Sequence, residues 1–182
     1  QALPIQKSWQ FEPMHPANLH MTLVFLGDKL RHSKPHMREK LAEFIDEFHI
    51  QQDAITFERL ELFPPTKRNL LIARFRVGPR TKEQITTLQQ RCFEANLTHE
   101  SPETTPFVAH ITLGKLRGVK AADLDRIQDQ LLKDAAWQRS DLLPSIEKQR
   151  CCLWYSDADK QPDTTVTAES MKELIDQLNL PA

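Results

Sequence analysis

Two stretches of the chain carry the same alternating pattern, and this repeat constrains the fold more than any other sequence feature. The first stretch, NLHMTLVFLG, covers residues 18–27, and the second, FVAHITLGKL, covers residues 107–116. In each, apolar side chains occupy alternate positions, while a histidine and a threonine lie between them. A period of two predicts two half-buried strands, each with an imidazole and a hydroxyl on the face away from its apolar side chains.

The remainder of the sequence predicts further strands and helices in alternation. The expected strands are 19–26, 54–63, 69–77, 107–116 and 146–155. The expected helices are 35–50, 81–97, 121–134 and 169–179, the second of them begun by a capping box of Thr81 and Gln84. A proline-marked turn at 64–68 suits antiparallel neighbours, so we expect an α+β architecture formed by residues 1–182 as one domain.

Composition narrows the class of protein. The net charge is −1, from 24 basic and 25 acidic residues, which gives no electrostatic signature of extended nucleic-acid binding. The three cysteines lack a CxxC spacing and favour a reducing compartment, so we expect a cytoplasmic protein. No apolar run reaches the roughly 18 residues of a membrane span, and we expect no membrane partner.

The repeated histidine and threonine suggest a specific chemistry. Cleavage of a phosphodiester needs a base that takes a proton from the attacking oxygen and an acid that gives one to the leaving oxygen. A solvated histidine side chain has a pKa of about 6.5, so a pair can supply both forms near neutral pH. His20 and His110 are therefore the candidate catalytic residues. The hydroxyls of Thr22 and Thr112 can donate hydrogen bonds to phosphate oxygens, with no metal or cofactor required.

The doubled His-x-Thr pattern resembles a known family. With LVFLG after the first motif, and Phe before and LGKL after the second, the chain resembles the 2H phosphoesterase superfamily. Within it, the likeness is particularly to the RNA 2′,3′-cyclic phosphodiesterases, historically called 2′-5′ RNA ligases (LigT-like). The separation of 90 positions between His20 and His110 is also similar to that family's, and the resemblance covers roughly residues 17–156.

The resemblance implies a fold and an assignment of roles. It implies two lobes, each an antiparallel sheet with helices outside, and an active site in the cleft between them. His20 would give a proton to the leaving oxygen, and His110 would activate water. The residues alone leave these two roles open, because the two motifs are nearly symmetric.

Four further residues are candidate substrate contacts. Lys67, Arg68 and Lys115 lie where they could steer a phosphate towards the motifs, although a solvated surface is the simpler interpretation of each. Trp154 could stack on a base, as could Tyr155 or Phe63, although core packing is the simpler role.

We therefore expect a monomeric, metal-independent phosphodiesterase that hydrolyses a 2′,3′-cyclic phosphate of an RNA end or a small nucleotide. Two alternatives remain open. One is a 2′-5′ oligoadenylate phosphodiesterase that uses the same four residues. The other is a non-catalytic nucleotide- or RNA-binding module on the same fold.

Overall fold

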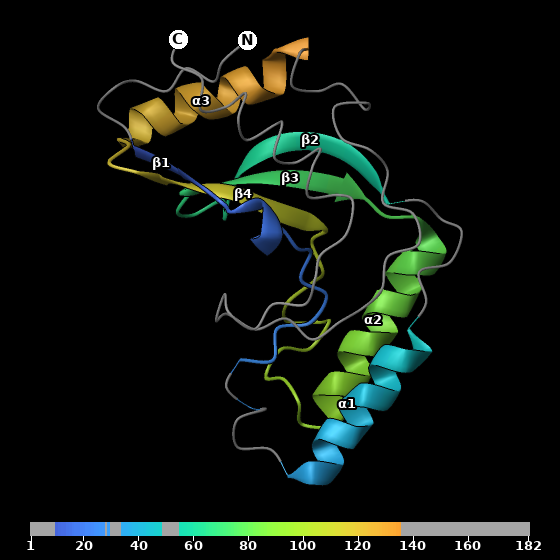
Figure 1. The fold of residues 1–182 in the computed structure, drawn as a ribbon. Coiled ribbons are helices and arrows are strands. Elements are labelled where there is room, and N and C mark those ends of the chain that lie inside the picture. The colour runs from blue at the N-terminus through green and yellow to red at the C-terminus, as the bar shows by residue number, and fades with distance from the viewer. Residues whose placement is uncertain (1–9, 28, 30–33, 49–54, 136–182) are drawn as a thin grey trace.

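The computed structural model describes residues 10–27, 29, 34–48 and 55–135. Four strands, three α-helices and one 3-10 helix are defined there (Figure 1). The strands are β1 (Gln10–Pro13), β2 (Thr56–Phe63), β3 (Leu70–Arg76) and β4 (His110–Arg117). The helices are η1 (Pro16–Asn18), α1 (Pro35–Glu47), α2 (Pro79–Glu94) and α3 (Ala121–Lys133).

The four strands form one antiparallel sheet in the order β1-β4-β3-β2. Between β3 and β4 the pairing passes from Ile72↔Thr112 to Leu71↔Gly114, so that Leu113 is an extra residue in β4. Such a bulge reverses the inward and outward alternation beyond it. Lys115, which pairs with Leu70, therefore shares a face of the sheet with Thr112.

One face of this sheet is apolar and is covered by α3. Leu60, Leu71, Ala73 and Ile111 are buried there against the α3 residues Ile127 and Leu131, in a group that we call the sheet cluster. Asp123 in the first turn of α3 and Lys133 in its last turn interact favourably with the helix dipole. The other face of the sheet carries His110 and Thr112.

The helices α1 and α2 lie side by side and form a second group of buried residues (Figure 1). This helix cluster contains Leu41, Phe44, Phe48, Ile85, Leu88, Cys92 and Leu97. Leu23, Val24 and Leu26 pack against it, whereas Val77 and Phe107 pack against both clusters. Of the helices that the structure describes, none has the length and apolar character needed to cross a bilayer.

The mixed α+β class is confirmed, and two local predictions are wrong. Residues 19–26 form a single bridge at Met21 instead of a continuous strand, because the side chains after Thr22 leave the sheet and pack on the helix cluster. Helix α2 begins at Pro79 with Gly78 as its N-cap, because proline suits the first helical position; Thr81 is buried within the first turn instead of capping it.

Other parts of the expected fold remain predictions. Within the described ranges every named strand belongs to the one sheet, so the second sheet of a two-lobed arrangement is not among them. The strand expected at 146–155 and the helix expected at 169–179 lie outside the described residues.

Candidate active site

A single antiparallel bridge joins the two motifs. Met21 pairs with Ile111, 90 positions further along the chain. In this register His20 lies opposite Thr112, and Thr22 lies opposite His110. Directly opposite residues share a face of a sheet, with Cβ atoms about 4.5–5.5 Å apart. The two halves of the sequence pattern thus meet at one place.

The four polar side chains point away from the sheet cluster. Leu19 belongs to that cluster, and Met21 packs against it. By alternation His20 and Thr22 project from the opposite face, as do His110 and Thr112 on either side of the buried Ile111. Thr22 is exposed and the other three are half-buried, whereas Ile72, which pairs with Thr112, is fully buried.

Each motif histidine is oriented by an equivalent hydrogen bond to a backbone oxygen. The His20 Nδ1 lies 2.8 Å from the backbone oxygen of Asn18, and the His110 Nδ1 lies 2.7 Å from that of Val108. A carbonyl oxygen only accepts, so Nδ1 is the donor in each ring. Nε2 is then the nitrogen through which either ring can take up or give up a proton.

The chain reaches Asn18 by a detour from the sheet edge. Strand β1 pairs with β4 as far as Pro13↔Gly114, and the Met14 amide still donates to the Leu113 oxygen at 2.7 Å. The one-turn helix η1 then leaves the sheet before Met21 returns to it. This detour places the Asn18 carbonyl beside the His20 ring.

Neighbouring strands contribute residues to the same face. The rings of Phe63 and His110 have centroids 5.0 Å apart and are tilted by 36°. Arg74 pairs with His110 across β3 and β4. The Arg74 Nη1 lies 2.8 Å from Glu61 Oε1. The other oxygen of this carboxylate, Glu61 Oε2, lies 2.9 Å from Arg59 Nε.

From the sequence, Phe63 is expected to stack on a base or to pack in the core, and Arg74 carries no signal. The contact of Phe63 with His110 and the position of Arg74 both depend on the register of the sheet, including its bulges. A period-two pattern does not reveal which strands become neighbours.

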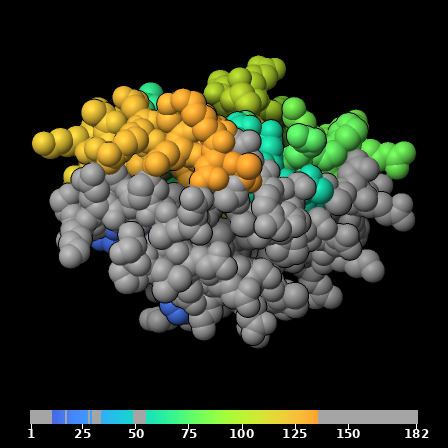
Figure 2. All heavy atoms as spheres, turned by 90° about the horizontal axis from the view of Figure 1, so that it is seen from above, coloured from blue at the N-terminus to red at the C-terminus, as the bar shows by residue number. Residues whose placement is uncertain are grey.

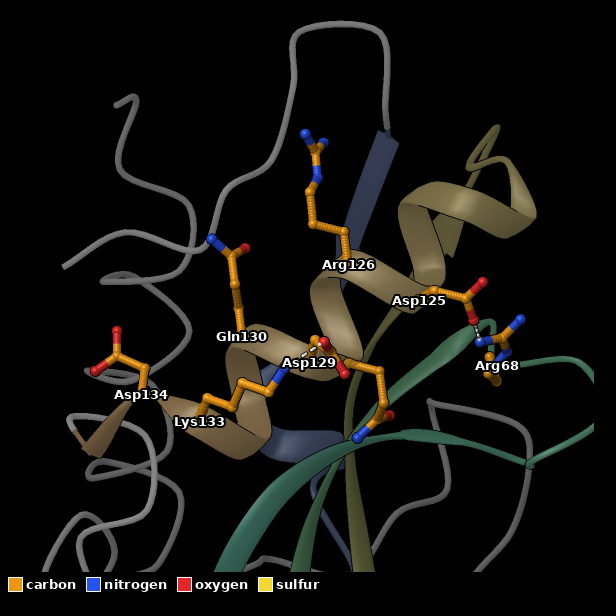
Figure 3. A pocket seen from close by; sticks show the side chains of 8 residues that line it. Arg68, Asp125, Arg126, Asp129, Gln130, Lys133 and Asp134 are labelled. Carbon is orange, nitrogen blue, oxygen red and sulfur yellow. Dashed lines mark hydrogen bonds and ion pairs between the residues drawn. The ribbon is translucent and has the colours of Figure 1, made fainter.

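The other predicted substrate contacts occupy different places. Lys115 is exposed on the histidine face, and Lys67 is exposed in the turn between β2 and β3. Arg68 forms an ion pair with Asp125 of α3 (Figure 3). Helix α3 covers the sheet face opposite to the one that carries His110. Trp154 lies outside the described residues. All four remain predictions.

Arg68 also lines an open groove along α3. The remaining lining residues are Asp125, Arg126, Gln128, Asp129, Gln130, Lys133 and Asp134 (Figure 3). In a view from above, α3 lies at the surface beside atoms of β2 (Figure 2). Ion pairs join Asp125 to Arg68 and Asp129 to Lys133, so charges of both signs already meet in the groove.

No group of three or more His, Cys, Asp or Glu side chains is arranged as metal ligands within the ranges that the structure describes.

Comparison with known proteins gives one family match. The family described as LigT like Phosphoesterase matches residues 2–72, a range that contains His20 and Thr22 and ends before the second motif. No curated protein and no solved structure matches the chain. The family match supports the 2H phosphoesterase superfamily and an enzyme of the phosphodiesterase type. The Met21–Ile111 bridge joins the second motif to a residue inside the matched range.

Proposed function

We propose that this protein hydrolyses a 2′,3′-cyclic phosphate of an RNA end or a small nucleotide, with His20 and His110 as the proton-transferring pair. One observation carries the proposal: a bridge joins Met21 to Ile111, the residues that follow the two motif histidines, and each histidine donates Nδ1–H to a backbone oxygen two residues before it. Held imidazoles support acid and base catalysis, because a proton donor or acceptor must be positioned at the reacting group.

The spacing between the rings supports the same interpretation. His20 and His110 are diagonal neighbours across the bridge, a relation with a separation of roughly 7–8 Å between backbone positions. Thr22 and Thr112 occupy the other two corners of this arrangement. A phosphate held at its centre would lie within reach of two imidazoles and two hydroxyls.

The proposed reaction transfers protons through the Nε2 atoms of the two histidines. His110 Nε2 takes a proton from water as the water oxygen forms a bond to phosphorus. The bond from phosphorus to one ribose oxygen breaks, and protonated His20 gives its Nε2 proton to that oxygen. Thr22 and Thr112 donate hydrogen bonds to the non-bridging oxygens, where negative charge accumulates. The assignment of acid and base follows the family resemblance.

The test is turnover of 2′,3′-cyclic AMP in the presence of EDTA. We expect the wild-type protein to open the ring and its rate to depend on pH as a bell-shaped curve, because one imidazole must be neutral and the other protonated. His20→Ala and His110→Ala should each lower kcat by about 10²- to 10⁴-fold.

His99→Ala is the matched control, because His99 is exposed in the loop after α2 and should not affect the rate. Activity that survives both motif substitutions, or that EDTA abolishes, would overturn the proposed mechanism.

The two alternatives give different results in the same assay. A 2′-5′ oligoadenylate phosphodiesterase would cleave 2′-5′-linked adenylates faster than the cyclic nucleotide, with the same dependence on His20 and His110. A binding module would retain the cyclic nucleotide without turning it over. The first result would replace the proposed substrate, and the second would remove the proposed catalytic role of His20 and His110.

A further inference from the structure

The two motifs are attached to the sheet in different ways. His110 and Thr112 belong to β4, which has β3 beside it along this length. Among the residues that the structure describes, the Met21 bridge is the sheet pairing found within residues 19–26. A catalytic group must be held close to its productive geometry, so further contacts of this segment bear on the site.

Two side chains bind the backbone immediately after Thr22. The Gln89 Nε2 of α2 donates to the oxygen of Leu23 at 3.1 Å, and the Thr98 Oγ1 donates to the oxygen of Phe25 at 2.7 Å. We propose that Gln89 and Thr98 are positioning residues that fix His20 and Thr22 for catalysis by anchoring this backbone. The inference rests on the proposed function and adds residues to its site.

The two bonds hold the backbone just beyond the bridge. Their acceptors, the oxygens of Leu23 and Phe25, lie two and four positions after Met21. The donors come from α2 and from the loop that follows it, and the chain bends at Leu23 between the bridge and the second bond. Helix α2 and its loop therefore fix the chain after the motif, while the bridge fixes it at Met21.

The side-chain oxygen of Thr98 connects two backbone segments. Its side chain is buried, with 2% exposure. Its oxygen also accepts a hydrogen bond from the Glu100 amide at 3.1 Å. A hydroxyl has one proton, so accepting from Glu100 leaves that proton for the Phe25 carbonyl. Valine has the same shape and can make neither bond.

The side-chain amide of Gln89 carries a cost in stability. Its Oε1 is buried and accepts no hydrogen bond in the part of the chain that the structure describes. A buried polar atom without a partner lowers stability. An apolar side chain such as leucine would avoid this penalty but would leave the Leu23 carbonyl without its donor. The bond to the Leu23 oxygen is thus the contact that distinguishes glutamine from leucine at this position.

The first experiment compares Thr98→Val with Thr98→Ser, which keeps the hydroxyl. We expect valine to lower kcat for the 2′,3′-cyclic nucleotide by about 10- to 100-fold, with KM changed by less than about threefold, because misplacing a catalytic group affects the chemical step more than binding. Serine should retain kcat within about threefold of the wild type. Equal rates for valine and the wild type would overturn the inference.

The second experiment uses Gln89→Leu, with Gln90→Leu as its matched control. Gln90 is the next residue of α2, and its Nε2 donates to Glu94 Oε1 at 2.8 Å, away from the motif. Leucine at 89 should lower kcat by about tenfold, whereas leucine at 90 should leave it unchanged. Loss of activity in both variants would point to a general effect on the helix and would overturn the inference. This pair also serves if Thr98→Val does not fold.

Hydrogen exchange separates failure of the inference from failure of the proposed function. Amides of residues 19–26 should exchange faster in Thr98→Val and Gln89→Leu than in the wild type, while exchange in β3 stays unchanged. If the wild-type protein has no phosphodiesterase activity, faster exchange would keep the anchoring role and remove only its catalytic purpose. Unchanged exchange at 19–26 would overturn the anchoring itself.

Discussion

At the scale of the residue, the two motif histidines are expected to share a tautomer that is the minor one for free histidine. Each Nδ1 faces a backbone oxygen, at 2.8 Å for His20 and 2.7 Å for His110. A neutral ring in this position must carry its proton on Nδ1. Long-range proton–nitrogen NMR spectra at alkaline pH should therefore show protonated Nδ1 and unprotonated Nε2 in both rings.

The exposed His99 is the internal reference for that spectrum, because the tautomer of a solvated ring is not imposed by a carbonyl. A proton on Nε2 of His20 or His110 at high pH would contradict the orientation proposed for catalysis.

The sequence names these residues as candidates but does not give their surroundings. Alternation alone places His20 with Thr22 and His110 with Thr112, since period two is a property of the strand backbone. The contacts of Phe63 with His110 and of Gln89 with Leu23 join residues 47 and 66 positions apart. Such contacts follow from packing and register, which neighbouring sequence does not encode.

At the scale of the element, Gly114 is expected to be required for β1 to lie against β4. A Cβ at this position would lie 2.7 Å from the backbone oxygen of Glu12 and would collide with the ring of Phe11. Neither the partner backbone nor a packed ring can move without cost. Gly114→Ala should therefore lower the free energy of unfolding by about 1–3 kcal/mol, as measured by urea denaturation.

Lys115→Ala is the neighbouring control, because Lys115 is exposed on the same strand and its replacement should change stability by less than about 0.5 kcal/mol. Equal stability of the two variants would show that β1 can shift away from β4 without loss.

The helices were predicted more accurately than the strand at 19–26, because a strand depends on a partner strand. The helices expected at 35–50 and 121–134 correspond to α1 and α3, because an apolar stripe such as Leu41 and Phe44 defines a helix locally. The strand expected at 19–26 failed after Thr22. Its apolar residues satisfy the pattern, but Leu23 and Leu26 pack on the helix cluster and Phe25 is 62% exposed.

At the scale of the whole molecule, the sheet cluster and the helix cluster meet beside the second motif. Val77 and Phe107 are the partly buried apolar residues that pack against both. Phe107 lies three positions before His110, and the first motif passes from one cluster to the other between Met21 and Leu23. The candidate site therefore lies where two packed units join, and its geometry depends on how firmly they are joined.

This dependence predicts the effect of Phe107→Ala. Loss of an aromatic side chain that contacts both clusters should lower the free energy of unfolding by about 2 kcal/mol, below the range for a fully buried phenylalanine. Urea denaturation followed by circular dichroism measures it. Phe93→Ala is the control, since Phe93 is 41% exposed on α2 and its loss should cost less than about 1 kcal/mol. Two separate transitions in the wild-type unfolding curve would contradict the joining of the clusters, because each cluster would then unfold at its own urea concentration.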